Sequence, residues 1–254
     1  DDLIESGNGA DTIVGGDGND DIDAGQGSDS VDGGDGNDTI NGLSGDDVIN
    51  AGLGDDSVLG GSQRDSIMGG EGNDTLDGQG GRDTINGDDG NDRINGGQQA
   101  DSLDGGLGND TLNGMSGPDT IAGQEGNDTI FGGGGADRIF GDGTDSLSTA
   151  MGDDSIAGNG GDDTIIGGNG ADNLNGGRGR DLIRSTFETT VMEAAPPPVP
   201  PPPGPSPMGN NVLDDAVDSG MGTAVAGTTT MLSNGTGDAT LQIEMTATGI
   251  FGSA

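Results

Sequence analysis

Aliphatic residues recur every nine residues over most of the chain, and each one follows an aspartate by two positions. Residues 33–41 read Gly-Gly-Asp-Gly-Asn-Asp-Thr-Ile-Asn, and residues 69–77 and 105–113 repeat this pattern closely. We number the positions of each unit from one to nine, starting at its first glycine, so that the aspartate is position six and the aliphatic residue is position eight. A pattern that stays in phase for this long indicates that each unit is one structural element of a stacked array.

Each unit predicts a turn followed by a very short strand. Glycine predominates at positions one, two and four, where it allows positive φ, so positions one to six are predicted as a turn. Positions seven to nine alternate polar, aliphatic and polar, which predicts a three-residue strand with position eight pointing inward. Two strands and two turns return the chain to its starting point. The sequence therefore predicts an all-β fold over residues 1–184, a parallel β-roll (a solenoid) of 18-residue coils.

Position five supports a coil of two units, because its residues differ between alternate units. In one set of units position five is Asn19, Asn37, Asp55, Asn73, Asn91, Asn109 and Asn127. In the other set it is Ala10, Ser28, Asp46, Arg64, Arg82, Ala100, Pro118 and Ala136. The two edges of the roll are therefore predicted to differ, one rich in Asn and one variable.

The charge of the chain points to cations. The formal net charge is −39, and only 27% of the residues are hydrophobic, a combination that is typical of disorder unless a repeat stacks. Such a charge argues against nucleic acid and anionic membrane surfaces as partners. No apolar run is long enough to span a membrane. The chain has no His, Cys or Lys, which excludes a serine or cysteine triad, a Schiff-base lysine and an ordinary zinc site, so we expect no enzyme activity in this sequence.

The position-six aspartates are the candidate metal ligands. Ca²⁺ prefers carboxylate and carbonyl oxygens, and a glycine-rich turn exposes its carbonyls beside each aspartate. Stacked turns would place like charges about one strand spacing apart, and a divalent cation between them would turn that repulsion into attraction. The predicted ligands are Asp11, Asp20, Asp29, Asp38, Asp47, Asp56, Asp65, Asp74, Asp83, Asp92, Asp101, Asp110, Asp119, Asp128, Asp137, Asp154, Asp163, Asp172 and Asp181.

The pattern Gly-Gly-x-Gly-x-Asp-x-aliphatic-x resembles the repeats-in-toxin (RTX) nonapeptide, the hemolysin-type calcium-binding repeat. The resemblance covers residues 1–184. It implies a parallel β-roll that holds Ca²⁺ between successive turns, on the order of 15 to 18 ions. It also implies type I secretion from a Gram-negative bacterium and a place outside the cell or on its surface. We further expect a monomer.

The sequence leaves the role of the whole protein open. The chain begins within a repeat and without Met, so we expect a fragment of a secreted protein whose folding depends on Ca²⁺. One alternative is the C-terminal repeat region of a secreted protease, lipase or pore-forming toxin with an upstream effector domain. Another is a surface adhesin or an ice-binding solenoid. The ice-binding reading is weakened by the position-three residues beside the Asn series, which include Asp17, Leu53 and Glu71.

The repeat is irregular over residues 141–150. Either one unit is shortened, with Asp145 continuing the aspartate series, or residues 142–150 loop out. We expect weakened Ca²⁺ binding there. Phe131 and Phe140 precede the irregularity at the outward position nine, and we expect them to pack under the irregular segment, with a docking spot for a partner as the alternative.

The repeat ends before the C-terminal third of the chain. Residues 185–193 are predicted to cap the last coil, and residues 194–207 form a Pro-rich linker with polyproline II character. Residues 208–254 are interpreted as an unassigned tail, disordered or the start of a truncated β domain. Leu241, Ile243 and Met245 alternate in it as in a strand.

Overall fold

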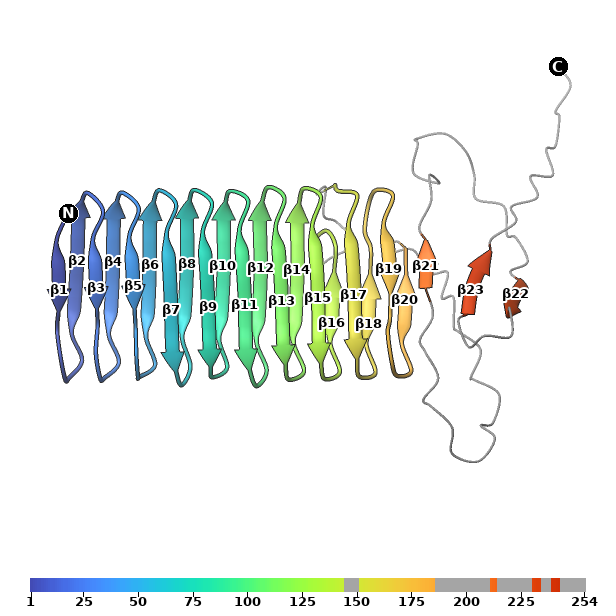
Figure 1. Cartoon of the computed structure of the whole chain (residues 1–254), viewed down its shortest axis with the longest axis horizontal. Coiled ribbons are helices and arrows are strands. Elements are labelled where there is room, and N and C mark those ends of the chain that lie inside the picture. Colours follow the sequence, from blue (N-terminus) through green and yellow to red (C-terminus); the bar gives the residue numbers. More distant parts are fainter. Residues whose placement is uncertain (144–150, 186–210, 214–229, 234–238, 243–254) are drawn as a thin grey trace, which may run out of the picture.

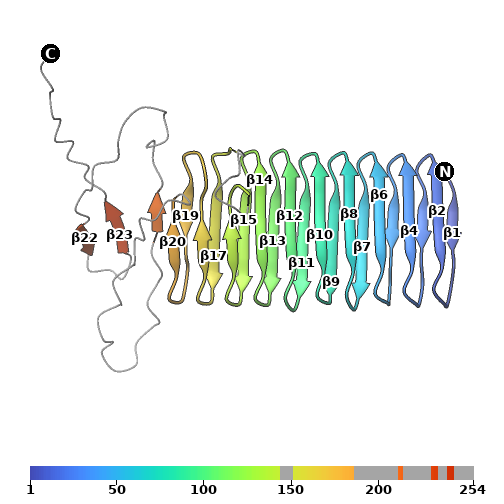
Figure 2. The same cartoon turned by 180° about the vertical axis from the view of Figure 1, so that it is seen from behind.

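The protein is a rod of two parallel β-sheets that face each other, with the chain winding from one sheet to the other (Figure 1). The computed structural model describes residues 1–143, 151–185, 211–213, 230–233 and 239–242. Figure 2 shows the same stack from behind, with the N-terminus at one end of the rod. The predicted all-β parallel roll is confirmed.

Within the roll, from β1 to β20, odd-numbered strands form one sheet and even-numbered strands form the other. The first sheet has 13 strands in the order β1-β3-β5-β7-β9-β11-β13-β15-β17-β19-β21-β23-β22, and the second has ten, from β2 to β20. The odd strands of the roll are β1 (Leu3–Glu5), β3 (Asp21–Asp23), β5 (Thr39–Asn41), β7 (Ser57–Ser62), β9 (Thr75–Gly80), β11 (Arg93–Gln98), β13 (Thr111–Ser116), β15 (Thr129–Gly134), β17 (Ser155–Gly160) and β19 (Asn173–Asn175). The even strands are β2 (Thr12–Asp17), β4 (Ser30–Asp35), β6 (Val48–Leu53), β8 (Ser66–Glu71), β10 (Thr84–Asp89), β12 (Ser102–Leu107), β14 (Thr120–Glu125), β16 (Arg138–Phe140), β18 (Thr164–Ile166) and β20 (Leu182–Arg184).

The register between strands confirms the 18-residue coil. Ile13 pairs with Val31 across β2 and β4, and Ile22 pairs with Ile40 across β3 and β5. Equivalent positions of successive coils therefore stack directly on one another. Each side chain has its counterpart one coil away as its nearest neighbour along the rod.

Two positions of each unit point into the roll. The position-eight residues, from Ile13 to Ile183, are buried and form one continuous core. Position one also faces inward, and Ala24 and Ala51, which replace its glycine, are fully buried. Because this second inward position carries glycine or alanine, the two sheets can approach closely and the core stays thin.

The strands are longer than predicted in many coils. β10 covers positions seven to nine of one unit and positions one to three of the next, so it is six residues long instead of three. Asp88 and Asp89 continue the pairing with Gly70 and Glu71 of β8, although they belong to the segment predicted as turn. The turn between such strands is reduced to positions four to six, which places the aspartate at its end.

Positive φ occurs at positions two and four but not at position one. Gly34 and Gly36 have φ of 114° and 135°, and a Cβ at either would meet the carbonyl oxygen of the equivalent glycine one coil earlier. Gly33, at position one, keeps an ordinary φ, but a Cβ there would meet the Ala51 carbonyl oxygen and the Asp38 carboxylate. Glycine at position one is therefore favoured by limited space.

The irregular segment is an insertion within one unit. β15 pairs with β17 in the register Thr129↔Ser155, and β16 pairs with β18 in the register Arg138↔Thr164. The unit runs from Gly141 and Asp142 to Met151 and onward, which supports the loop-out alternative over a shortened unit. Asp142, which that alternative placed in the loop, keeps its position in the coil. Asp145 lies outside the described residues.

The two phenylalanines beside the insertion differ. Phe140 is buried in a small cluster with Ala122 and Ile166 on the outer side of the even-numbered sheet, and Arg138 lies over its ring at 5.0 Å. Phe131 is 38% exposed. Phe140 is thus covered by Ala122, Ile166 and Arg138. Residues 144–150 lie outside the described residues, so the packing of the two phenylalanines under the irregular segment stays a prediction.

Three short strands extend the odd-numbered sheet beyond the repeats. β21 (Asn211–Leu213) pairs antiparallel with β19, and β23 (Ala239–Gln242) pairs with β21 and with β22 (Thr230–Ser233). Leu241 lies in β23, as the alternation predicts. Ile243, Met245, residues 186–193 of the predicted cap and the linker at 194–207 lie outside the described residues. No helix in the described part of the chain is long and apolar enough to cross a membrane.

Candidate metal centres along the two edges

The predicted aspartates form two columns, one along each edge of the roll. The column on the Asn-rich edge holds Asp20, Asp38, Asp56, Asp74, Asp92, Asp110, Asp128, Asp154 and Asp172, and the column on the variable edge holds Asp11, Asp29, Asp47, Asp65, Asp83, Asp101, Asp119, Asp137, Asp163 and Asp181. All but Asp11 and Asp181 are buried. The structure thus brings the whole predicted set together, turn by turn.

One oxygen of each carboxylate joins two coils. Oδ1 of Asp92 accepts the backbone N–H of Asp74 at 2.8 Å, and Oδ1 of Asp110 accepts that of Asp92 at the same distance. The ladder crosses the insertion without a break, because Asp128 donates its N–H to Oδ1 of Asp154 at 2.9 Å. Each aspartate therefore satisfies a backbone donor of the coil before it.

The second oxygen of most of these carboxylates is buried without a hydrogen-bond partner. This holds for Oδ2 of Asp11, Asp20, Asp29, Asp38, Asp47, Asp56, Asp65, Asp74, Asp83, Asp92, Asp101, Asp110, Asp119, Asp128, Asp137, Asp154, Asp163 and Asp181. Buried polar atoms in folded proteins are normally paired, and an unpaired carboxylate oxygen is among the costliest to bury. A column of such atoms indicates that each edge is built to receive cations.

Burial raises the pKa of several position-six carboxyl groups in the middle of the rod. Desolvation raises the pKa of Asp56, Asp65, Asp92 and Asp119 to about 7, the accepted backbone N–H lowers it in part, and carboxylates one coil away raise it further. The same effects raise the pKa of Asp154 to about 8. Burial without a cation therefore disfavours the ionised form of these five carboxyl groups.

Backbone oxygens lie beside the unpartnered Oδ2 atoms. A Cβ built on Gly78 would lie 2.5 Å from Oδ2 of Asp83 and 2.7 Å from the carbonyl oxygen of Gly96, one coil later. At Gly132 the corresponding distances are 2.6 Å to Asp137 and 2.9 Å to Gly158. Glycine thus leaves a small space into which a carboxylate oxygen and a carbonyl oxygen both point.

Side chains alone do not make a complete metal site here. Within the described ranges, no three acidic side chains come close enough to hold one ion. A cation between two turns would therefore draw the rest of its ligands from backbone carbonyls. Ca²⁺ accepts such mixed oxygen shells, and Zn²⁺ prefers the nitrogen and sulfur ligands of His and Cys, which this chain lacks.

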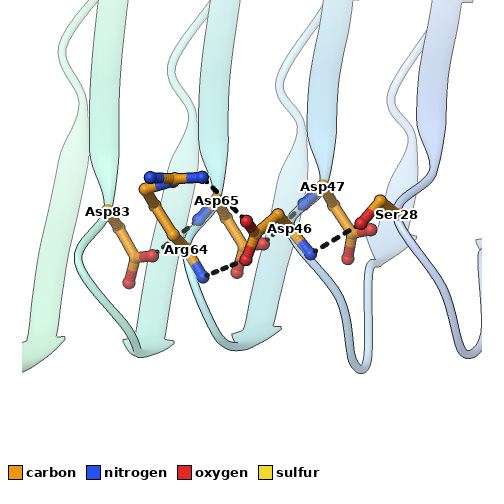
Figure 3. A network of polar contacts seen from close by, with 6 residues as sticks. All are labelled: Ser28, Asp46, Asp47, Arg64, Asp65 and Asp83. Atoms are coloured by element: carbon orange, nitrogen blue, oxygen red, sulfur yellow. Dashed lines mark hydrogen bonds and ion pairs between the residues drawn. The ribbon is translucent and has the colours of Figure 1, made fainter.

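Position five forms a second ladder that differs between the edges. On the Asn-rich edge, the amide oxygen of Asn91 accepts the N–H of Asn109 at 2.9 Å, and equivalent bonds extend from Asp1 to Ala171. On the variable edge, Figure 3 shows Ser28, Asp46 and Arg64 in such a row beside the column of position-six aspartates. The Arg64 guanidinium also forms an ion pair with Asp46 at 2.8 Å.

The family assignment follows from the repeats themselves. A family model for the RTX calcium-binding nonapeptide repeat matches residues 1–31, 25–58, 32–67, 59–94, 77–112, 87–121, 113–147 and 149–183. The chain belongs to the RTX calcium-binding repeat family. A comparison with curated proteins gives no match.

The RTX repeats of this chain fit the ion that their family implies. The donor set on each edge consists of carboxylate and carbonyl oxygens, which are the ligands of Ca²⁺, and the unpartnered Oδ2 atoms are available to it. The bound ion would supply the positive charge that neutralises the buried carboxylates. Asp and glycine residues of this chain do the rest, because Oδ1 holds the coils in register and glycine keeps the space open.

The repeat pattern did not predict one buried acidic residue of these RTX turns. Asp142 stands at position two, where most units have glycine, and it is buried to 1% exposure. Its place in the irregular unit could be read only once the register across the insertion was known. The only sign of it in the sequence is that an aspartate directly follows the position-one glycine. Asp88 stands at the same position of another unit, so this sign is not specific.

Proposed function

We propose that this chain is a Ca²⁺-folded module of a secreted bacterial protein and carries no catalytic activity of its own. The observation that carries the proposal is the column of buried, unpartnered Oδ2 atoms along each edge. Burying an ionised carboxylate without a partner lowers the stability of the folded state by roughly several kcal/mol. Ca²⁺ between the turns removes this cost, so the folded roll and the bound ions stabilise each other.

Calcium concentration then decides whether the roll folds. A site with a Kd of about 0.1 mM, typical of extracellular modules, contributes about 2.7 kcal/mol at about 10 mM Ca²⁺. With on the order of 15 to 18 ions the contributions add up to a decisive term, whereas the thin core offers little else. The module would remain unfolded in the cytosol and fold outside the cell.

Secretion and an effector elsewhere in the protein complete the proposal. RTX repeats are typical of secreted proteins, which supports an extracellular or cell-surface location. The absence of His, Cys and Lys leaves the repeats without most nucleophiles and general bases, which supports an effector, such as a protease, lipase or pore-forming domain, in another part of the protein. Antibodies against the repeats should detect the protein in the culture medium and not in the cytosol.

Calcium-dependent folding is tested by far-ultraviolet circular dichroism and small-angle scattering at pH 7.5. We expect an expanded, unstructured chain in chelator and a compact β-rich rod in 10 mM Ca²⁺. Equal concentrations of Mg²⁺ serve as the control and should not restore the rod, because Mg²⁺ requires smaller octahedral sites. An unchanged spectrum and radius of gyration between chelator and Ca²⁺ would refute the proposal.

A further inference from the structure

We infer that the turn interrupted by the insertion is a Ca²⁺ site with an additional carboxylate, Asp142, and that it binds Ca²⁺ more tightly than the uninterrupted turns of the same edge. The inference rests on the proposed Ca²⁺ binding and concerns residues 141–142 and 151–154 with the following coil. It reverses the expectation from the sequence, in which the irregularity weakens the site.

The insertion leaves the turn itself intact. Asp154, at position six, donates its N–H to Oδ1 of Asp172 at 3.0 Å, and Asp153, at position five, donates to Asn127 at 2.7 Å. Gly126 donates to the Met151 carbonyl oxygen at 3.1 Å, so position three is also in register. Both ladders of the Asn-rich edge thus continue through this coil.

At the interrupted turn, the carboxylate of Asp142 takes the place of a backbone carbonyl oxygen as a hydrogen-bond acceptor. In other turns the N–H of position three donates to the position-two carbonyl oxygen one coil back, as Gln26 donates to Gly7 at 2.7 Å. Here the N–H of Asn169, at position three, donates to Oδ2 of Asp142. The carboxylate therefore lies between its own coil and the next, in the layer where a metal ion would lie.

The same layer contains the unpartnered oxygen of Asp154. Oδ2 of Asp154, a residue only 2% exposed, has no hydrogen-bond partner and points into the space beside Gly141, together with the carbonyl oxygen of Gly167. Asp142 donates its own N–H to that Gly167 oxygen at 3.1 Å. This turn thus holds two buried carboxylates, Asp142 and Asp154, where the other turns of the Asn-rich edge hold one.

An extra carboxylate near the ion strengthens Ca²⁺ binding, because the affinity of oxygen sites rises with the charge of their ligands. Asp88 shows that position two alone does not suffice. It lies in an uninterrupted turn of the same edge, with φ of 69°, and its carboxylate is on the outer face of β10, where Oδ1 accepts from the side chain of Asn86. In the interrupted turn, the Asp142 carboxylate instead accepts the backbone N–H of Asn169 in the next coil.

The chain has no Trp or Tyr, so a single tryptophan reports on the nearest bound Tb³⁺, a luminescent substitute for Ca²⁺. Met151 and Leu107 are both exposed and both at position three of Asn-rich-edge turns, one interrupted and one not. In the Met151→Trp and Leu107→Trp chains, bound Tb³⁺ is excited through the tryptophan and then displaced by added Ca²⁺. The fall in Tb³⁺ luminescence gives the Ca²⁺ affinity of the nearest site. We expect the Met151→Trp chain to bind Ca²⁺ about tenfold more tightly than the Leu107→Trp chain.

Asp142→Asn, which keeps an acceptor for Asn169 but removes the charge, should weaken Ca²⁺ binding about tenfold in the Met151→Trp chain. Asp142→Gly restores the residue that most units have at position two and should weaken Ca²⁺ binding by about the same factor. Agreement between the two variants would show that the loss does not come from misfolding of Asp142→Asn. The matched control is Asp88→Asn in the Leu107→Trp chain, because Asp88 lies in the strand that pairs with the strand of Leu107. This substitution should change the Ca²⁺ affinity by less than about twofold.

The outcomes separate the two proposals. If neither reporter gives a Tb³⁺ signal that Ca²⁺ reverses, the proposed function fails, and the inference with it. If both do, but the Met151→Trp chain binds no more tightly than the Leu107→Trp chain, or Asp142 variants leave its affinity unchanged, only the inference is overturned.

Discussion

Each position-six aspartate has two tasks, and its two oxygens divide them. Oδ1 accepts a backbone N–H of the preceding coil, as Oδ1 of Asp92 accepts the N–H of Asp74. Oδ2 of Asp92 has no hydrogen-bond partner and lies beside the carbonyl oxygen of Gly105 in the next coil. An asparagine keeps the first task and loses the charge required for the second, so the two tasks can be separated by experiment.

Asp92→Asn should therefore reduce the number of bound Ca²⁺ ions by about one or two, because each turn contributes to the sites on both of its sides. Asp89→Asn, an exposed substitution three residues away, is the control and should leave the number of ions unchanged. Isothermal titration calorimetry with equilibrium dialysis gives the count. Equal counts in wild-type and Asp92→Asn chains would show that Oδ2 binds no ion.

At the scale of the elements, the turns tolerate side chains only where the backbone conformation permits them. Gln63 and Gln99 replace the position-four glycine and are held at φ of 84° and 79°. A non-glycine residue in this region costs roughly 1–2 kcal/mol. These two turns, both on the variable edge, are therefore strained relative to their neighbours.

Gln99→Gly should raise the free energy of unfolding in Ca²⁺ by about 0.5–1 kcal/mol, because relief of the φ strain outweighs the extra freedom of glycine in the unfolded chain. Gln98→Gly is the matched control, since Gln98 lies in β11 with ordinary strand backbone, and it should be neutral or destabilising. Urea unfolding at fixed Ca²⁺ measures both. A gain from Gln98→Gly and none from Gln99→Gly would contradict the explanation.

The elements also show the limits of the sequence pattern. The alternation at positions seven to nine predicted the inward aliphatic residues correctly, from Ile13 to Ile183. It did not predict that strands such as β10 extend through positions one to three. Glycine has no strand preference of its own, and these residues become strand because neighbouring coils offer hydrogen-bond partners in register.

At the scale of the whole molecule, two columns of like charge oppose folding unless they are neutralised. Folding raises the pKa of Asp56, Asp65, Asp92 and Asp119 from 3.8 to about 7. Between these pH values the Ca²⁺-free folded state holds protons that the unfolded state has released. The contribution of these groups to stability is therefore full below about pH 4 and is lost as the pH rises to about 7.

In chelator, the roll should accordingly be more folded at pH 4 than at pH 7.5, as measured by circular dichroism and thermal unfolding. In 10 mM Ca²⁺ the trend should reverse, because protons compete with the ion for the same carboxylates. Binding of Ca²⁺ at pH 6 should also release protons, which calorimetry in buffers of different ionisation enthalpy detects. A Ca²⁺-free chain whose stability rises from pH 4 to pH 7.5 would contradict the raised pKa values.

The sequence alone determined the coil, the inward residues and the aspartate columns, because a strict repeat makes each residue's neighbour its own equivalent 18 positions away. Local pattern and long-range contact coincide in such a fold. Only the tertiary structure decided the register across the insertion, the contact of the Asp142 carboxylate with the next coil and the exposure of Phe131. These features interrupt the repeat, so they depend on contacts between coils that no periodicity encodes.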